Sequence, residues 1–257
     1  MQTLPTLYIP RIHAAALSRP RDGLLLEALD ALAEKLADAQ VHSPTASALM
    51  AGSVLTSDDA PHALFCLGDP SREALAAWFR LSWSTYTSLL FVASSQLDET
   101  SCISRDDVPL VTGHGCILAS RGASGEPLAG MRVGRLREEL VDSRALLSEA
   151  AGYQVRVLAP RPTALGTTVD GLVLEEARRA GYRRVLHPGV GLLDLDDDPI
   201  ADQPAGCARL SYRTVQTDDT VDELARWILD ERLTRPAARI RQLARTPRRF
   251  IDRLFDS

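Results

Sequence analysis

Aromatic residues, methionine and cysteine are scarce in this sequence: aromatics make up 5% of its 257 residues, and there are 3 methionines and 4 cysteines. The cysteines lie far apart and form no Cys-x-x-Cys pair. The sequence therefore predicts neither a zinc ribbon nor a disulfide framework. We interpret all four as small buried hydrophobic residues: Cys66, Cys102, Cys116 and Cys207.

An excess of positive charge is also missing, because 34 acidic residues outnumber 29 basic ones and the formal net charge is -5. No overall field draws the molecule onto nucleic acid, so we expect no nucleic-acid partner. Long hydrophobic runs are lacking too: the first residues do not form a secretory signal, and no window reaches the length of a membrane span. We therefore expect a cytoplasmic protein.

The hydrophobic content of 45% is enough to bury a substantial core, and we expect one α/β domain of barrel size. Short apolar runs typical of strands alternate with amphipathic patterns typical of helices. The predicted strands are 6–9, 62–68, 87–94, 108–115, 153–160, 183–189 and 208–215. The predicted helices are 24–39, one from Pro70, one from Gly134 to Gly152, 170–181 and one from Thr220, whereas 191–206 reads as an exposed loop.

Two short joins from a helix to a strand support a parallel sheet, because parallel βα units require such connections. The order of the segments resembles the polysaccharide deacetylases, also called the NodB-homology fold, over most of the chain. The most specific stretch begins with Gly-His-Gly at 113–115 and ends with a helix that closes on Ala-Gly-Tyr at 180–182. The resemblance implies a distorted (β/α) barrel over residues 1–230, with its pocket at the carboxyl ends of the parallel strands.

Active members of this family hold a divalent metal with one Asp and two His, and a second Asp is the general base. The metal lowers the pKa of its bound water while the free carboxylate takes a proton. The family's His-x-x-x-His motif maps to His-Gly-Cys-Ile-Leu, so the resemblance implies that His114 is a metal ligand and that Leu118 replaces the second. Either zinc or another divalent metal is then held with a substitute ligand, or no metal is bound. The candidate substitutes are His62, Cys116 and His187.

The family's Asp-Asp motif can be placed in two ways. By its letters, Asp58 is the catalytic base and Asp59 a metal ligand; by strand spacing, Asp69 is the ligand and Gly68 stands where the base belongs. Arg161 corresponds, one residue displaced, to the arginine that orients the base in the family. Purely structural roles are alternatives to these catalytic ones. Asp58 and Asp59 are typical of an exposed turn, and Asp69 is typical of a helix N-cap.

The C-terminal residues 231–257 carry eight arginines among apolar side chains, which predicts a basic amphipathic helical tail. Such a face is either merely solvated or binds a protein partner or an anionic membrane surface through residues 232–257, which would make the protein membrane-peripheral.

The resemblance implies a carbohydrate or polysaccharide ligand. We expect a divergent deacetylase-like protein linked to N-acylated sugars in cell-surface or extracellular polysaccharide production, with hydrolase activity impaired or lost. Two alternatives stay open: an active metal-dependent deacetylase with a non-standard third ligand, and a non-catalytic scaffold that binds a biosynthetic partner or a membrane.

Overall fold

The computed structural model describes part of the chain, and every structural statement below concerns that part. The described residues are 3–9, 12–13, 24–51, 62–68, 70–72, 75, 86–113, 116–163, 166, 168–187, 191–195, 209–216 and 219–231.

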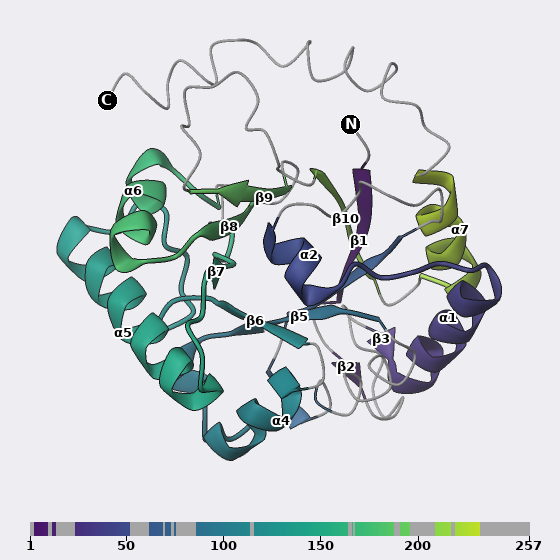
Figure 1. The fold of residues 1–257 in the computed structure, drawn as a ribbon, viewed down its shortest axis with the longest axis horizontal. Coiled ribbons are helices and arrows are strands. Elements are labelled where there is room, and N and C mark those ends of the chain that lie inside the picture. The colour runs from purple at the N-terminus through teal and green to yellow at the C-terminus, as the bar shows by residue number, and fades with distance from the viewer. Residues whose placement is uncertain are drawn as a thin grey trace, which may run out of the picture.

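One curled sheet dominates the fold, with the strand order β10-β1-β4-β5-β6-β7-β8-β9 (Figure 1). Seven of these strands are parallel and form a curled half-barrel, and β9 pairs antiparallel with β8 at one edge. The edge strands β9 and β10 approach each other, which gives the distorted barrel its shape. The strands are β1 (Thr3–Ile9), β4 (Leu64–Leu67), β5 (Ser88–Val92), β6 (Cys116–Ser120), β7 (Val157–Leu158), β8 (Arg184–His187), β9 (Gly191–Asp194) and β10 (Arg209–Thr214). A separate small parallel sheet pairs β2 (Ile12–His13) with β3 (Leu24–Leu25).

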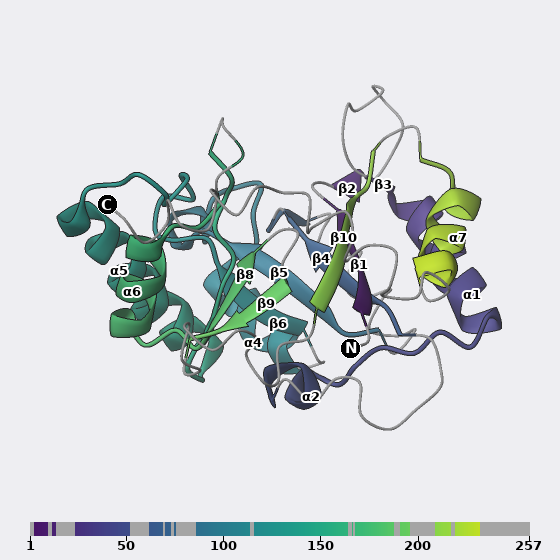
Figure 2. The same cartoon turned by 90° about the horizontal axis from the view of Figure 1, so that it is seen from above.

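Most of the helices cover the sheet from outside, and one short helix packs against the core inside the barrel. The helices are α1 (Leu26–Asp38), α2 (Ala46–Ala51), α4 (Val108–Gly113), α5 (Val133–Ala151), α6 (Gly171–Ala180) and α7 (Val221–Glu231), with two 3-10 turns, η1 (Ser94–Gln96) and η2 (Arg105–Asp107). Both views place α5 and α6 together on one side of the molecule and α1 and α7 on the other (Figures 1 and 2). An ion pair between Lys35 and Asp222 links α1 to α7. In the described part of the chain, no helix has the length and apolar character needed to cross a bilayer.

Strands β4, β5 and β6 are buried on both faces, and alternate side chains therefore enter two different cores. In β6, Cys116 and Leu118 belong to the large core between the sheet and the outer helices. Ile117 and Ala119 belong to a smaller core that fills the barrel interior. This alternation decides which side chains can reach a site inside the barrel.

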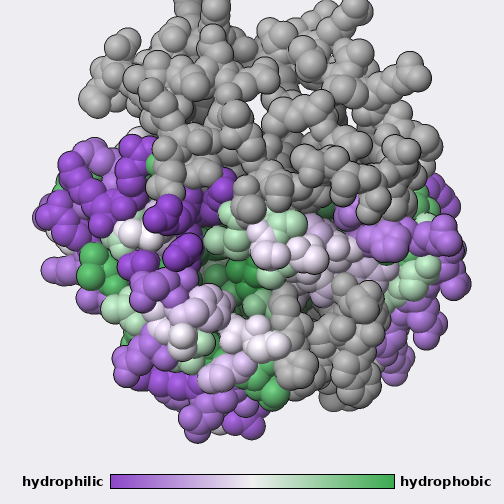
Figure 3. Space-filling model, viewed as in Figure 1, coloured by the Kyte–Doolittle hydropathy of each residue, from purple (hydrophilic) through white to green (hydrophobic). Residues whose placement is uncertain are grey.

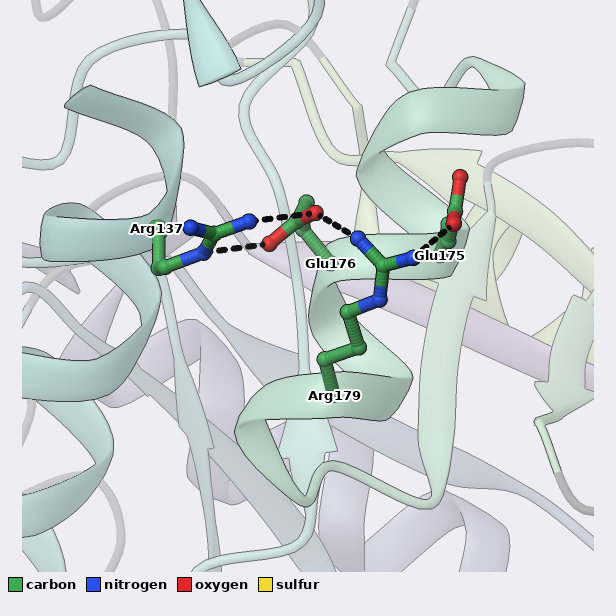
Figure 4. Close-up of polar contacts among 4 residues, drawn as sticks. All are labelled: Arg137, Glu175, Glu176 and Arg179. Carbon is green, nitrogen blue, oxygen red and sulfur yellow. Dashed lines mark hydrogen bonds and ion pairs between the residues drawn. The ribbon is translucent and has the colours of Figure 1, made fainter. Parts of the chain in front are cut away.

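A buried carboxylate joins α5 to α6. Glu176 on α6 is 1% exposed and accepts two bonds from Arg137 on α5, Nε to Oε2 at 3.0 Å and Nη2 to Oε1 at 3.1 Å (Figure 4). Arg179 Nη1 donates to Glu176 Oε1 at 2.6 Å, and Arg179 also pairs with the exposed Glu175. The hydrogen bond from Arg137 is the main reason that the pKa of Glu176 lies below its usual value.

Several predicted boundaries are confirmed by the capping residues. Helix α5 ends at Gly152 and α6 at Gly181, both in the left-handed conformation that glycine adopts without a steric cost. The predicted capping box before α7 is present, since Thr220 and Glu223 exchange hydrogen bonds. Strands β4, β5, β8 and β10 lie inside their predicted ranges.

Two predictions of secondary structure are wrong, and one predicted strand is shorter than expected. The predicted strand 108–115 is instead helix α4 over residues 108–113; the capping box of Ser104 and Asp107 starts a helical segment there, and Pro109 is tolerated in a first turn but not in a strand ladder. Strand β7 is only Val157–Leu158, much shorter than 153–160. The predicted loop 191–206 begins with strand β9, which pairs with β8. The predicted basic tail, residues 232–257, lies outside the described residues and stays a prediction.

Candidate functional site

Most of the site residues expected from the sequence lie outside the described residues. These are Asp58, Asp59, Asp69 and His114, whose roles as base and metal ligands therefore stay predictions. Arg161 is described: it is exposed and lies two residues beyond Ala159, past the carboxyl end of β7.

The residues considered as substitute metal ligands do not come together. His62 precedes β4 and lies beside His42, with ring centroids 6.2 Å apart. His187 is the last residue of β8, so it lies at the opposite end of the parallel sheet from His62. Cys116 is the first residue of β6, and burial raises the pKa of its thiol to about 12. Within the described residues, no group of three or more His, Cys, Asp or Glu side chains could hold a metal ion.

Leu118 does not occupy a position from which a metal ligand could reach the barrel interior. It is the middle residue of β6, 1% exposed, and its side chain packs in the core between the sheet and the outer helices. The interpretation of Leu118 as a replaced ligand is therefore corrected: an apolar side chain is what this position requires. The sequence analysis placed the Gly-His-Gly motif at the end of a predicted strand over 108–115. Residues 108–113 form helix α4 instead, so the motif precedes strand β6.

The carboxyl end of the sheet holds a different cluster inside the barrel. Phe91 follows Leu89 in the interior core, and Tyr8 packs against that core from β1. Arg121 follows Ile117 and Ala119 at alternate positions, directly after the end of β6. The inward-facing side chains of β1, β5 and β6 thus end, at the carboxyl end of the sheet, in Tyr8, Phe91 and Arg121 respectively.

These three side chains are in direct contact. Arg121 Nη2 donates a hydrogen bond to Tyr8 Oη at 2.7 Å, across 113 residues of sequence. The guanidinium carbon of Arg121 lies 5.2 Å from the centroid of the Phe91 ring, within the range of a cation–π interaction. The rings of Tyr8 and Phe91 are stacked with centroids 5.7 Å apart. We call Tyr8, Phe91 and Arg121 the arginine cluster.

Gly68 leaves the space that the Tyr8 ring occupies. A Cβ atom at position 68 would lie 2.5 Å from Tyr8 Oη, closer than non-bonded atoms approach. The alignment by strand spacing places Gly68 where the family has its catalytic base. The structure explains why a glycine is needed here, because the Tyr8 ring occupies the space of a side chain. Any side chain at this position would displace Tyr8, and with it the partner of Arg121.

The backbone around Arg121 is held by hydrogen bonds to three other elements, β5, η1 and α5. Arg121 N donates to Val92 O at 2.8 Å, which extends the pairing of β5 and β6 by one residue. Ser95 N donates to Ala123 O at 2.9 Å, and Ser124 N donates to the buried carboxylate of Glu139 on α5 at 2.8 Å. The segment 121–124 is therefore fixed before any ligand arrives.

Arg121 is a buried positive charge for which the described residues supply no counter-charge. Its side chain is 5% exposed, and its Nε atom has no hydrogen-bond partner. Among the described residues, no carboxylate forms an ion pair with it. Burying a charge in this way costs several kcal/mol, roughly, unless the charge is paired.

The resemblance to deacetylases implies a divalent metal at the carboxyl ends of the strands, and the described residues at this end do not fit one. A guanidinium has donors only and cannot coordinate a cation. Its fixed charge would also repel one, by about 4 kcal/mol per unit of cation charge at 4 Å and an effective dielectric constant of about 20. The arginine cluster is suited to a negative group.

A cavity of about 440 Å³ lies elsewhere, at the amino ends of β6 and β7. Figure 3 shows a hollow with an apolar floor in this region of the face viewed in Figure 1. Its lining includes Met50 from α2, Ile117 from β6 and Val157 from β7, with Arg156 and Gln154 as polar members. This cavity is separate from the arginine cluster, because the strands are parallel and the cluster lies at their other end.

The sequence reasoning missed Arg121 and Tyr8. A signal for Arg121 was present, since Cys-Ile-Leu-Ala-Ser is an apolar run that ends in the Gly-rich segment Arg-Gly-Ala-Ser-Gly. Because residues 108–115 were predicted to be a strand, the apolar run after them was not recognised as strand β6, and its end was overlooked. Nothing in the sequence linked Tyr8 to Arg121, because their contact depends on the neighbouring positions of β1, β4, β5 and β6.

No family model matches this sequence, and no curated protein matches it either. Solved structures do match. A polysaccharide deacetylase from Bacillus cereus superposes with a TM-score of 0.68 over 88% of this chain and 69% of its own, at 16% identity. The deacetylase PplD of Streptococcus pyogenes gives 0.67 over 87% of this chain and 96% of its own, at 12% identity. IcaB from Ammonifex degensii gives 0.66 over 89% and 97%, at 16% identity. The distorted (β/α) barrel of the deacetylase type, expected from the sequence, is thereby confirmed.

Proposed function

We propose that this chain, which has the polysaccharide-deacetylase fold, binds N-acylated sugars in cell-surface or extracellular polysaccharide production and has impaired or lost hydrolytic activity. The likeness in fold to polysaccharide deacetylases supports the carbohydrate ligand. Because one fold hosts many functions, the argument about activity must come from the site. The observation that carries it is Arg121, which is buried at the carboxyl end of the sheet and forms no ion pair with any described carboxylate.

Metal-dependent amide hydrolysis needs a cation to polarise the carbonyl and to lower the pKa of a bound water. It also needs a group that takes the proton from that water. Arg121 can do neither, since a guanidinium remains protonated in proteins and has no acceptor atom. Gly68 and the Tyr8 ring fill neighbouring space, so the described residues at this end supply no base.

The test is an assay of the purified full chain with N-acetylated chitooligosaccharides, in the presence of zinc or cobalt. We expect acetate release no faster than in buffer, while an active deacetylase run in parallel releases acetate. Metal-stimulated release by this chain would contradict the proposal. It would support the alternative, an active metal-dependent deacetylase with a non-standard third ligand.

A further inference from the structure

We propose that Arg121 binds an oxyanion carried by the saccharide ligand, so that the ligand of this barrel is an acidic sugar. This inference rests on the proposed function for the saccharide and on the arginine cluster for the charge. The shared chemistry is a group with two or more anionic oxygens, either the carboxylate of a uronic acid or the phosphate of a phosphorylated sugar.

The hydrogen-bonding state of Arg121 differs from that of a paired arginine in the same chain. Arg137 uses both Nε and Nη2 to bind the two oxygens of Glu176, at 3.0 and 3.1 Å. Arg121 uses Nη2 on Tyr8, and its Nε has no partner. An oxyanion would supply the counter-charge that no described carboxylate gives Arg121, and its oxygens are acceptors suited to a guanidinium.

The guanidinium is held for binding from several sides. Phe91 lies against it at 5.2 Å, and Tyr8 fixes one of its nitrogens at 2.7 Å. The backbone segment that carries it is bonded to β5 and to Glu139. A group oriented in this way loses little conformational freedom when a ligand binds. Tyr8 is only partly buried, so the cluster reaches the surface there.

The position of Arg121 also favours a ligand. Parallel α/β sheets bind ligands at the carboxyl ends of their strands, and Arg121 directly follows the end of β6. This position and the charge of Arg121 together predict a preference for negative ligands at this end.

The test compares three saccharides by isothermal titration calorimetry on the full chain: an oligogalacturonide, N-acetylglucosamine 6-phosphate and neutral N-acetylchitotriose. We expect at least one acidic saccharide to bind about tenfold more tightly than the neutral one, or about 1.4 kcal/mol. Preference for the oligogalacturonide identifies a carboxylate, and preference for the sugar phosphate identifies a phosphate. Equal affinities for all three, or no binding of either acidic saccharide, would overturn the inference.

Arg121→Met and Arg135→Met form a matched pair of variants, since each removes one positive charge. Arg135 is 57% exposed and pairs with Glu126 on the surface. We expect Arg121→Met to abolish the preference for the acidic saccharide and Arg135→Met to keep it. Arg121→Met should also keep or raise the midpoint of thermal unfolding, because an unpaired buried charge is replaced by an apolar chain. A merely structural arginine would give the opposite result, a lowered midpoint with an unchanged affinity ratio.

The two proposals can fail separately. Binding of neutral chitotriose without any preference for charge would remove the oxyanion site and leave the proposed function standing. Metal-stimulated acetate release would contradict the proposed loss of hydrolysis, whatever the affinities for acidic saccharides.

Discussion

Gly68 and Tyr8 share one small space at the carboxyl end of the sheet. A Cβ atom at position 68 would meet the Tyr8 hydroxyl at 2.5 Å and two carbons of the same ring at 2.7 and 2.8 Å. The backbone at Gly68 is fixed by its bond to Ile9 O, so the ring must move instead. One methyl group at this position therefore tests whether the arginine cluster is tightly packed.

We expect Gly68→Ala to lower the free energy of unfolding by about 1–3 kcal/mol, the usual cost of overpacking. Urea denaturation would measure the change. Gly134→Ala is the matched control, because nothing lies within 4 Å of its added Cβ in helix α5. It should leave stability unchanged or raise it by about 0.5–1 kcal/mol, since alanine is the better helix former. Equal effects of the two substitutions would show that Tyr8 is loosely held.

At the residue scale, the sequence predicts which apolar residues are buried better than it predicts which polar residues form the candidate site. The four cysteines were predicted to be buried hydrophobic residues, and the three that the structure describes, Cys66, Cys102 and Cys116, are all buried. Arg121 could not be identified as interior, because its burial depends on which strand it follows and on the register of that strand. The prediction of a strand over 108–115 also hid strand β6, whose carboxyl end Arg121 follows.

At the scale of elements, the salt bridge between α5 and α6 is the clearest long-range polar contact on the outer layer. Glu176 is buried and bound by Arg137 and Arg179, which lie on two different helices (Figure 4). Because Arg137 lowers the pKa of Glu176, this carboxylate stabilises the fold above its unfolded pKa, and the stabilisation is lost as the pH falls through the folded value.

We expect Glu176→Gln to lower the midpoint of urea denaturation at pH 7 and to flatten its fall between pH 5 and lower values. The substitution removes the charge while it keeps the size of the side chain. Glu175→Gln serves as the control, since Glu175 is 55% exposed and pairs only with Arg179. It should change the midpoint little at any pH. Identical acid profiles for the wild type and Glu176→Gln would refute the role of this contact.

Elements with local start and stop signals were predicted well from the sequence. Helices α5 and α6 end at glycines in left-handed conformations, and α7 begins at a capping box, so short-range rules place their ends. Strand β6 and helix α4 were not predicted. The first residues of α4, Val-Pro-Leu-Val, are apolar enough for a strand, and only the proline favours a helix. Strand β9 was missed for a related reason, as its acidic neighbours hide a short apolar run that pairs with β8.

At the scale of the whole molecule, the order of strands and helices was sufficient to predict the barrel. Parallel βα units require short helix-to-strand joins such as the two found in the sequence, and the observed sheet has seven parallel strands. The chemistry of the barrel could not be predicted in the same way. It depends on which side chains face inward at one end of the sheet, and that is a property of the whole curled sheet and not of any one motif.

The basic tail raises a prediction about the whole chain. Residues 232–257 carry eight arginines, and clustered arginine with apolar side chains suits an anionic membrane surface. We expect the full chain to sediment with vesicles that contain phosphatidylserine, and deletion of residues 232–257 to abolish this. Vesicles of phosphatidylcholine alone are the control. Equal recovery of the two chains would eliminate the tail as a membrane-binding element.

A charge that is built into a side chain cannot dissociate, and this distinguishes Arg121 from a bound ion. A barrel with such a charge at its mouth is complete as soon as the chain has folded, whatever the supply of zinc around it. Metal sequestration, which silences enzymes that depend on an exchangeable cofactor, would leave the attraction between this barrel and an acidic sugar intact.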